Sequence, residues 1–262
     1  MLLIVVFGPV YWALNTALLP KEKLGATPAA YLPIPPRTDS FSAVIHYGPF
    51  LNSLWNSVLV AGGAALISVL LGSFAACALG RYQFRGRRAI LYLLLSMSIF
   101  PQIAVVGALF HLSQQTGLYN TRTGLLLSHL LLTLPFTIWV LTTFFRAMPV
   151  ELEESAYVDG ATPFQTFWKI LLPLSAPGIA TTGILAFIAS WNEYLFALSL
   201  TADNKARTAT VIIAQFKGTM QYEIPWGEIM AASLLATAPL IVVVLIFQRF
   251  IVGGLTAGGV KG

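Results

Sequence analysis

The stretch ESAYVDGATPFQTFWKILLP, Glu154–Pro173, lies between two long apolar runs of the sequence. Upstream, Pro149 stands where proline pre-organises the first turn of a helix, and three glutamates follow it, where the helix dipole favours acids. Gly160 stands just past the expected C-terminus of this helix, a position that glycine commonly occupies. The pattern therefore predicts a short helix over Val150–Asp159.

A second short helix is predicted directly after this glycine. Thr162, Pro163 and Gln165 occupy the N-cap, N1 and N3 positions of a capping box. Bulky apolar residues then recur at the spacing of one helix face: Phe164, Phe167, Trp168 and Leu171. Pro173 should end the helix, because proline lacks the backbone N–H. Such a helix pair can dock on a partner protein or serve only as an amphipathic return to the membrane, and the residues alone leave both readings open.

The composition around this stretch is typical of a polytopic membrane protein. Of the 262 residues, 57% are hydrophobic and 10% are charged, and the mean hydropathy is +0.78, whereas a soluble domain carries about a quarter charged residues. A membrane-spanning helix needs about 20 mostly apolar residues. Six segments qualify: Met1–Leu19, Ser53–Leu79, Ala89–Phe110, Thr123–Phe145, Pro177–Leu200 and Trp226–Phe247. We therefore expect an all-α fold with six transmembrane helices in one domain over residues 1–262.

Arginines predict which ends of the spans face the cytoplasm, because cytoplasmic loops carry an excess of Lys and Arg. The loop 81–88 holds Arg81, Arg85, Arg87 and Arg88, whereas the loop 111–122 holds only Arg122. Loop 81–88 is therefore expected to be cytoplasmic. Alternation places the other connecting segments: 146–176 and the C-terminal tail 248–262 in the cytoplasm, 20–52 and 201–225 outside.

Several classes of site are excluded by what the sequence lacks. The single cysteine, Cys77, lies in an apolar run and reads as a small buried hydrophobe. The three histidines have no metal-ligand spacing, so no metal site is expected. The net charge of +5 comes without a basic stripe interleaved with aromatics, which argues against nucleic-acid binding. The first apolar run starts at Met1 without a charged n-region, which leaves a signal peptide or a start within a longer coding sequence as alternatives.

The opening stretch resembles the EAA loop of the permeases of ATP-binding-cassette (ABC) importers. The matching positions are Glu154, Ala156, Gly160, Ile170 and Leu172-Pro173, and Ser155 takes the place of the first alanine of the pattern. The resemblance covers nearly the whole chain. It includes WNEYLFALSL at Trp191–Leu200, which is similar to the fifth span of carbohydrate-type permeases, and QRFIVGGLTAGGVKG at Gln248–Gly262, which is similar to the tail of the smaller permease subunit of maltose-type transporters.

This resemblance implies a coupling role for the loop 146–176. In the family, the first short helix docks in a cleft of a separate ATPase, and the tail reaches into the ATPase dimer interface. The residues expected to make the coupling contact are Glu154, Ser155, Ala156, Asp159, Gly160, Ala161 and Phe164. Those expected in the tail contact are Ala257, Gly258, Gly259 and Lys261. The chain has no GxxxxGK[ST] phosphate loop, so ATP and Mg²⁺ are expected in the partner ATPase and no cofactor is expected here.

The resemblance also implies partners and a sugar path. The expected partners are a second permease in a heterodimer, two ATPase subunits, an extracytoplasmic sugar-binding protein and the lipid membrane. Polar groups within spans tend to face the bundle interior, and the candidates for the path are Asn192, Glu193, Tyr194, Gln102 and Trp191. Gln102 follows Pro101, which is expected to bend the helix of its span. The loop 201–225 is expected to contact the binding protein through its tip, Gln215–Tyr222, and the expected contact residues are Gln215, Phe216, Lys217, Gly218, Thr219 and Met220. The apolar run VIIAQF in this loop is expected to pack rather than to be disordered. Hydrogen bonds between helices and an interfacial aromatic belt remain alternatives for the path residues.

The function that fits best is therefore a non-catalytic permease subunit of an ABC importer in a prokaryotic inner membrane, for an α-glucoside disaccharide such as maltose or trehalose. A secondary transporter or channel would show inverted repeats or rings of intramembrane charge, and neither is found in the sequence. An intramembrane enzyme would show a clustered catalytic motif, which is also missing.

Overall fold

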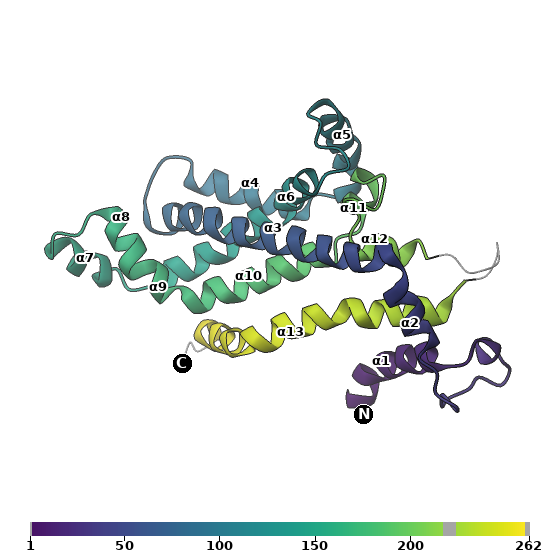
Figure 1. Cartoon of the computed structure of the whole chain (residues 1–262). Coiled ribbons are helices and arrows are strands. Elements are labelled where there is room, and N and C mark those ends of the chain that lie inside the picture. Colours follow the sequence, from purple (N-terminus) through teal and green to yellow (C-terminus); the bar gives the residue numbers. More distant parts are fainter. Residues whose placement is uncertain (1, 217–223, 260–262) are drawn as a thin grey trace.

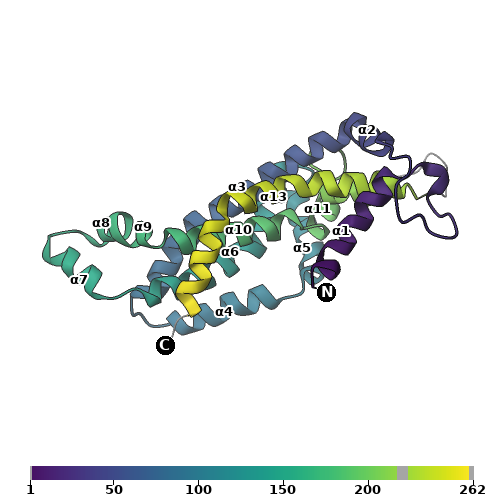
Figure 2. The same cartoon turned by 90° about the horizontal axis from the view of Figure 1, so that it is seen from below.

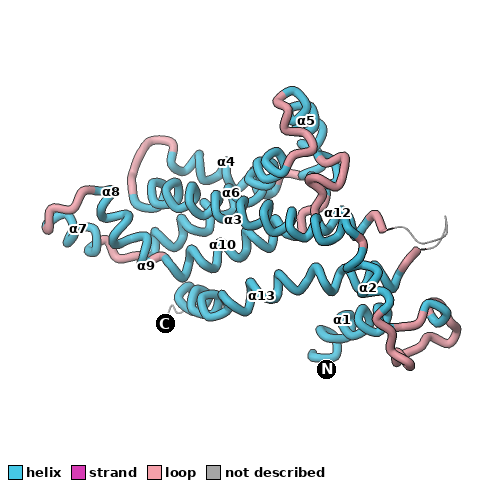
Figure 3. The backbone as a smooth tube through the Cα atoms, viewed as in Figure 1, coloured by secondary structure: helices cyan, strands magenta, loops and turns pink. Residues whose placement is uncertain are grey.

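The computed structural model describes residues 2–216 and 224–259, and these residues form helices and no strand (Figure 3). The long helices run alongside one another, and the short ones gather at the two ends of the bundle (Figure 1). In chain order the helices are α1 (Leu2–Leu18), η1 (Lys21–Lys23), α2 (Asp39–His46), α3 (Gly48–Arg81), α4 (Arg87–Ile99), α5 (Gln102–Gln115), α6 (Arg122–Ala147), α7 (Glu151–Val158), α8 (Pro163–Thr166), η2 (Phe167–Leu171), α9 (Leu172–Leu174), α10 (Ala176–Trp191), α11 (Leu195–Leu200), α12 (Ala209–Ala214) and α13 (Trp226–Gly259).

Helix α3 lies at the centre of the bundle, because it packs against both α6 and α10. Its buried side includes a row of small residues: Ala61, Ala65, Ser68, Gly72 and Ala76. Small residues let membrane helices approach closely. A Cβ added at Gly72 would lie 2.7 Å from Cγ2 of Thr137 on α6. A larger residue at Gly72 would therefore push these two helices apart.

Among the residues that the structure describes, three helices are long and apolar enough to cross a membrane, over Gly48–Arg81, Arg122–Ala147 and Trp226–Gln248. Two bent helix pairs would raise this number to five, and the apolar part of α1, Val5–Leu18, is shorter. The six predicted spans are consistent with this arrangement, and the all-α prediction is confirmed for the described residues.

The predicted span Ala89–Phe110 is not one straight helix. Helix α4 ends at Ile99, α5 begins at Gln102, and the two axes are bent by 93°. Phe100 and Pro101 between them both have extended backbone. Proline disfavours the helical region for the residue before it, so the bend expected beside Pro101 is a full break.

The predicted span Pro177–Leu200 is also interrupted, which the sequence analysis missed. Helix α10 ends at Trp191, and α11 begins at Leu195. The Glu193 carboxylate between them accepts hydrogen bonds from the backbone N–H groups of Phe196 and Ala197, at 2.8 and 3.0 Å. A side chain that binds these free donors favours a new helix start over a continuing helix, so the chain breaks here without proline or glycine.

The short elements form two groups at opposite ends of the bundle (Figures 1 and 2). Helices α7–α9 and the α3–α4 loop lie at one end, and α2, α12 and the segment 201–208 lie at the other. Loops 81–88 and 146–176, which were predicted to share the cytoplasm, therefore lie together. The assignment of this end to the cytoplasm stays a prediction from the arginines.

Candidate functional site

The first predicted short helix is present at the protruding end of loop 146–176. Helix α7 covers Glu151–Val158, within a residue or so of the predicted range. Gly160 follows it with a φ of +81°, in the left-handed region that favours glycine. The Ala161 N–H then donates to the Ala156 carbonyl at 2.9 Å, which closes the helix C-terminus.

The predicted capping box begins the second helix, α8. The Thr162 hydroxyl accepts from the Gln165 N–H at 3.3 Å, and the Gln165 side chain accepts from the Thr162 N–H at 2.9 Å. Both contacts satisfy backbone donors that a helix start otherwise leaves unpaired. This local prediction is confirmed in full.

The prediction that Pro173 ends the second helix is wrong. The helix continues from α8 through the π-turn η2 and α9 to Leu174, and the chain then bends by 74° into α10. Proline normally clashes with the carbonyl four residues before it. Here that residue, Lys169, lies within the widened turn Phe167–Leu171. The wider turn accommodates the proline ring, so the break moves to Ser175.

The predicted aromatic face divides into two stripes. Phe164 and Trp168 are 65% and 50% exposed, and their rings stack with centroids 6.3 Å apart. Phe167 and Leu171 are buried in a cluster that includes Ala76, Cys77, Leu141 and Phe145 of α3 and α6. One stripe therefore anchors the helix pair to the bundle, and the other remains exposed at the surface of the chain.

The acids of α7 point in different directions. Glu154, Ser155 and Asp159 are exposed, as expected of residues that contact a partner, and Gly160 beside them is exposed as well. Ala156 is 4% exposed and packs inward. Ala161 is half-buried. Whether this surface contacts an ATPase stays a prediction.

Glu153 faces the bundle and forms an ion pair with Arg81, the last residue of α3. The two side chains are 10% and 7% exposed. The Arg81 guanidinium also donates to the carbonyls of Phe145, Met148 and Pro149, at 3.2, 2.8 and 3.3 Å. From the sequence, Arg81 is predicted only to mark a cytoplasmic loop, and this contact is not predicted. Two features of the sequence could have indicated the contact. Arg81 stands at the end of an apolar run, and the acids of α7 stand in a second loop predicted on the same side of the membrane.

The next residue along the chain strengthens the same contact. Burial raises the pKa of the Tyr82 hydroxyl to about 12, and a side-chain hydrogen bond with Tyr157 of α7 acts in the same direction. A tyrosine hydroxyl is neutral at physiological pH with or without this shift, so its proton is available for the bond.

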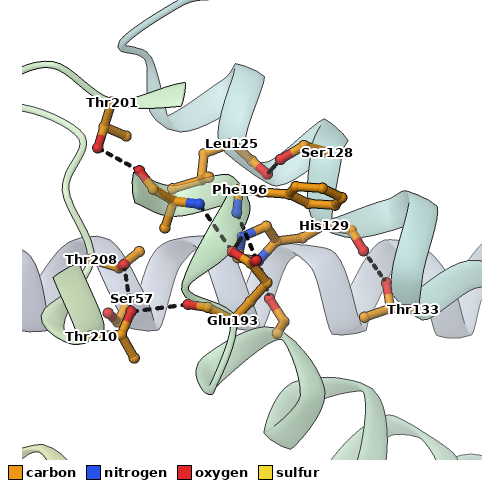
Figure 4. A network of polar contacts seen from close by, with 12 residues as sticks. Ser57, Leu125, Ser128, His129, Thr133, Glu193, Phe196, Thr201, Thr208 and Thr210 are labelled. Atoms are coloured by element: carbon orange, nitrogen blue, oxygen red, sulfur yellow. Dashed lines mark hydrogen bonds and ion pairs between the residues drawn. The ribbon is translucent and has the colours of Figure 1, made fainter. Parts of the chain in front are cut away.

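A second polar cluster surrounds Glu193 at the break between α10 and α11 (Figure 4). Glu193 is 5% exposed and His129 of α6 is fully buried. Their Oε2 and Nε2 atoms lie 3.2 Å apart, at ion-pair distance but without the alignment of a hydrogen bond. His129 Nδ1 lies 2.6 Å from the Ser190 hydroxyl, and the Thr210 hydroxyl donates to the Glu193 carbonyl at 2.9 Å. The cluster thereby joins α6, α10, α11 and α12.

The residues predicted for a sugar path separate by exposure. Gln102, at the break between α4 and α5, is exposed. Asn192 and Tyr194, at the break between α10 and α11, are exposed as well. Glu193 and Trp191 are buried within the chain, and Trp191 packs against Phe187 with ring centroids 5.4 Å apart. The contact of any of these with sugar stays a prediction.

The loop 201–225 is partly described. The prediction that VIIAQF packs is confirmed, because Val211 and Ile212 of α12 are 0% and 3% exposed. Phe216 packs against Tyr47 with ring centroids 5.2 Å apart, and Gln215 caps α12. The remaining predicted contact residues, Lys217, Gly218, Thr219 and Met220, lie outside the described residues.

The predicted tail residues continue the last helix. Ala257, Gly258 and Gly259 belong to the backbone of α13, and Lys261 lies outside the described residues. The contact of this segment with a partner stays a prediction.

Comparisons with known proteins match this architecture. The family model of the binding-protein-dependent transport system inner membrane component matches residues 68–256. The trehalose transport system permease protein SugB of Mycobacterium tuberculosis is 42% identical over 97% of this chain and 92% of its own length. The trehalose/maltose transport system permease protein MalG of Thermococcus litoralis is 44% identical over 83% of this chain and 77% of its own length.

A solved structure shows the same fold at lower identity. A chain of a bacterial ABC transporter involved in the import of the acidic polysaccharide alginate superposes with a TM-score of 0.79 at 21% identity. The match covers 95% of this chain and 91% of that chain.

Proposed function

The chain belongs to the family of inner-membrane components of binding-protein-dependent transport systems, and from this membership we propose that it is the permease subunit of an ABC importer for an α-glucoside disaccharide such as maltose or trehalose. The sugar class is supported by the names of the two relatives. The family assignment also argues against a secondary transporter, a channel or an intramembrane enzyme.

The coupling role is carried by one observation, the shape of loop 146–176. The loop presents an acidic, exposed helix surface at the tip of a rigid unit whose other side is buried in the bundle. We place the ATPase on the exposed surface, with Glu154 pairing with a basic group of the ATPase. Glu154 stands in the first turn of α7, so it also stabilises the positive end of the helix dipole.

The proposed partners are those that the family resemblance implies. The chain forms half of the pathway with a second permease, two ATPases hold ATP and Mg²⁺, and a binding protein delivers the sugar outside. ATP-driven closure of the ATPase dimer moves the coupling surface, and the bundle alternates between two states because α7 makes different contacts in each. The membrane is a prokaryotic inner membrane, with loop 146–176 and the C-terminus in the cytoplasm. The four arginines of loop 81–88, at the same end of the bundle, support this orientation.

For the sugar path, we favour the exposed residues at the helix breaks. Gln102, Asn192 and Tyr194 offer amide, hydroxyl and aromatic groups that suit a sugar face. Glu193 already accepts two backbone hydrogen bonds and faces His129, so its main effect on the path is to shape the break.

Purification of a tagged chain in mild detergent, with its neighbouring genes co-expressed, tests the assembly. We expect one second permease and two ATPases per copy. ATPase activity of the purified complex, with the binding protein and either maltose or trehalose, then tests the substrate. Purification of the chain alone or as a homodimer would overturn the proposal. An assembled complex stimulated by neither disaccharide would overturn the sugar class and leave the coupling role standing.

A further inference from the structure

Arg81 joins three helix ends through one buried side chain. It is the last residue of α3, it pairs with Glu153 in the first turn of α7, and it donates to carbonyls at and after the last turn of α6. Only 7% of its side-chain surface is exposed. No other arginine forms an ion pair with an acid of α7 among the described residues.

These contacts match what a planar guanidinium does and a lysine does not. The last carbonyls of a helix lack partners within the helix, and Arg81 supplies donors to Phe145, Met148 and Pro149 in a fan from one rigid group. The Glu153 carboxylate balances the buried charge. A buried charge whose partner is removed is strongly unfavourable, so α3 and α7 are expected to move together.

A second contact seats the other half of the loop on the same part of α3. Phe167 and Leu171 pack against Cys77, which lies four residues before Arg81 and therefore on the same face of the helix. Phe74, one turn further back, contacts the Phe167 ring with centroids 4.9 Å apart. Both halves of the loop therefore rest on the last turns of α3.

Helix α3 reaches from this loop to the opposite end of the bundle. There Ser57 accepts a hydrogen bond from the Ala209 N–H at 2.9 Å, and Asn56 donates to the Arg207 carbonyl at 2.9 Å. Between these points α3 packs along α6 and α10. One rigid helix thus connects the loop with the segment before α12.

We infer that Arg81 is a positioning residue that transmits movement of the coupling surface to α3, so that α3 carries the movement across the membrane. The inference rests on the proposed function, because it assumes that an ATPase moves the surface. Glu153, the partner of Arg81 in the buried ion pair, has the same positioning role.

The test uses the complete transporter in proteoliposomes, with the binding protein and either maltose or trehalose. The readout is the number of sugar molecules transported per ATP hydrolysed, which a general loss of folded complex does not change. We expect Arg81→Gln and Glu153→Gln to lower this ratio about fivefold or more, the usual lower range of a coupling effect. Arg81→Lys keeps the positive charge but loses the guanidinium that donates to three carbonyls. Its ratio should therefore lie between those of Arg81→Gln and the unaltered protein.

Matched controls come from the same segments. Arg85 and Glu151 are exposed and have no ion pair among the described residues, so Arg85→Gln and Glu151→Gln should leave the ratio unchanged. If Arg81→Gln fails to assemble, Glu153→Gln decides, because it keeps the guanidinium and its carbonyl contacts.

The outcomes separate this inference from the proposed function. A lowered ratio in Glu154→Gln with unchanged ratios in the Arg81 and Glu153 variants would overturn the inference alone. Unchanged ratios in all of these variants would also overturn the coupling role of loop 146–176. Proportional losses of uptake and ATPase activity, at a constant ratio, would show that Arg81 is merely structural and would likewise overturn the inference.

Discussion

Two groups of carboxylates stand out against the apolar sequence, and the structure uses them in opposite ways. Glu154 of α7 and Asp159 directly after this helix are exposed at the tip of a protruding loop. Glu193, at the break between α10 and α11, is 5% exposed and contacts the backbone and His129 of its own chain. A carboxylate in a membrane protein therefore needs its contacts examined before it is given a role.

The difference also explains how each region keeps its shape. The ion pair between Arg81 and Glu153 fixes the buried side of α7 to the bundle, so the exposed residues of this helix are free to contact a partner. In the Glu193 region the carboxylate itself stabilises the local structure, because it accepts hydrogen bonds from the first backbone N–H groups of α11. Substitutions should accordingly separate stability from coupling, and the three below run from the largest expected effect on stability to the smallest.

Glu193→Ala should cause the largest loss of stability. It leaves two buried N–H groups without an acceptor and removes the partner of His129. A buried N–H group left without an acceptor costs about 1–3 kcal/mol, and two are affected here. Thermal unfolding of the purified protein in detergent measures the change. Glu193→Gln retains one acceptor oxygen and should lose less, and an unchanged midpoint in Glu193→Ala would show that the cluster does not hold the break.

Gly160→Val should have an intermediate effect on stability and a strong effect on coupling. A β-branched residue at a φ of +81° is strained, at a cost of about 1–3 kcal/mol. The strain comes from the backbone alone, because no described residue beyond the two chain neighbours lies within 4 Å of the added Cβ. Uptake should fall while the protein remains in the membrane. Gly160→Asn tolerates this backbone conformation better and serves as the control. Normal uptake by the valine variant at equal protein levels would contradict the coupling assignment.

Glu154→Gln should have the smallest effect on stability. The side chain is exposed, and its loss removes only a dipole interaction of about 0.3–1 kcal/mol. Sugar-stimulated ATPase activity and uptake should nevertheless fall, because the partner loses its ion pair. Glu151→Gln, an exposed glutamate in the same turn, is the matched comparison. Equal activities in the two variants would remove the special role of Glu154.

The sequence predicts structure well where the signal is local. Gly160 and the capping box of Thr162 and Gln165 depend on a few neighbouring residues, and all are found as predicted. The proline by itself predicts the break beside Pro101. The break at Glu193 depends on a hydrogen bond between its side chain and the backbone of the next helix, which the sequence pattern does not indicate. Helical periodicity placed four bulky residues on one face, but the bundle decides that Phe167 is buried and Phe164 is not.

The candidate site was predicted in part for the same reason. The exposed residues of α7 follow from a motif that is continuous in sequence. The contact between Arg81 and Glu153 joins residues far apart in the chain, and nothing in either segment alone specifies it. The shift of the helix end from Pro173 to Ser175 likewise depends on a widened turn that no local pattern indicated.

The burial of Cys77 gives this transporter component a built-in chemical reporter. It is the single cysteine of the chain, it is 5% exposed, and it lies beneath Phe167 and Leu171. A maleimide can reach its sulfur only when local opening uncovers it, so the labelling rate reports the free energy of that opening. Comparison of labelling with and without nucleotide would time the release of the loop from α3 in the unaltered protein, with no engineered probe.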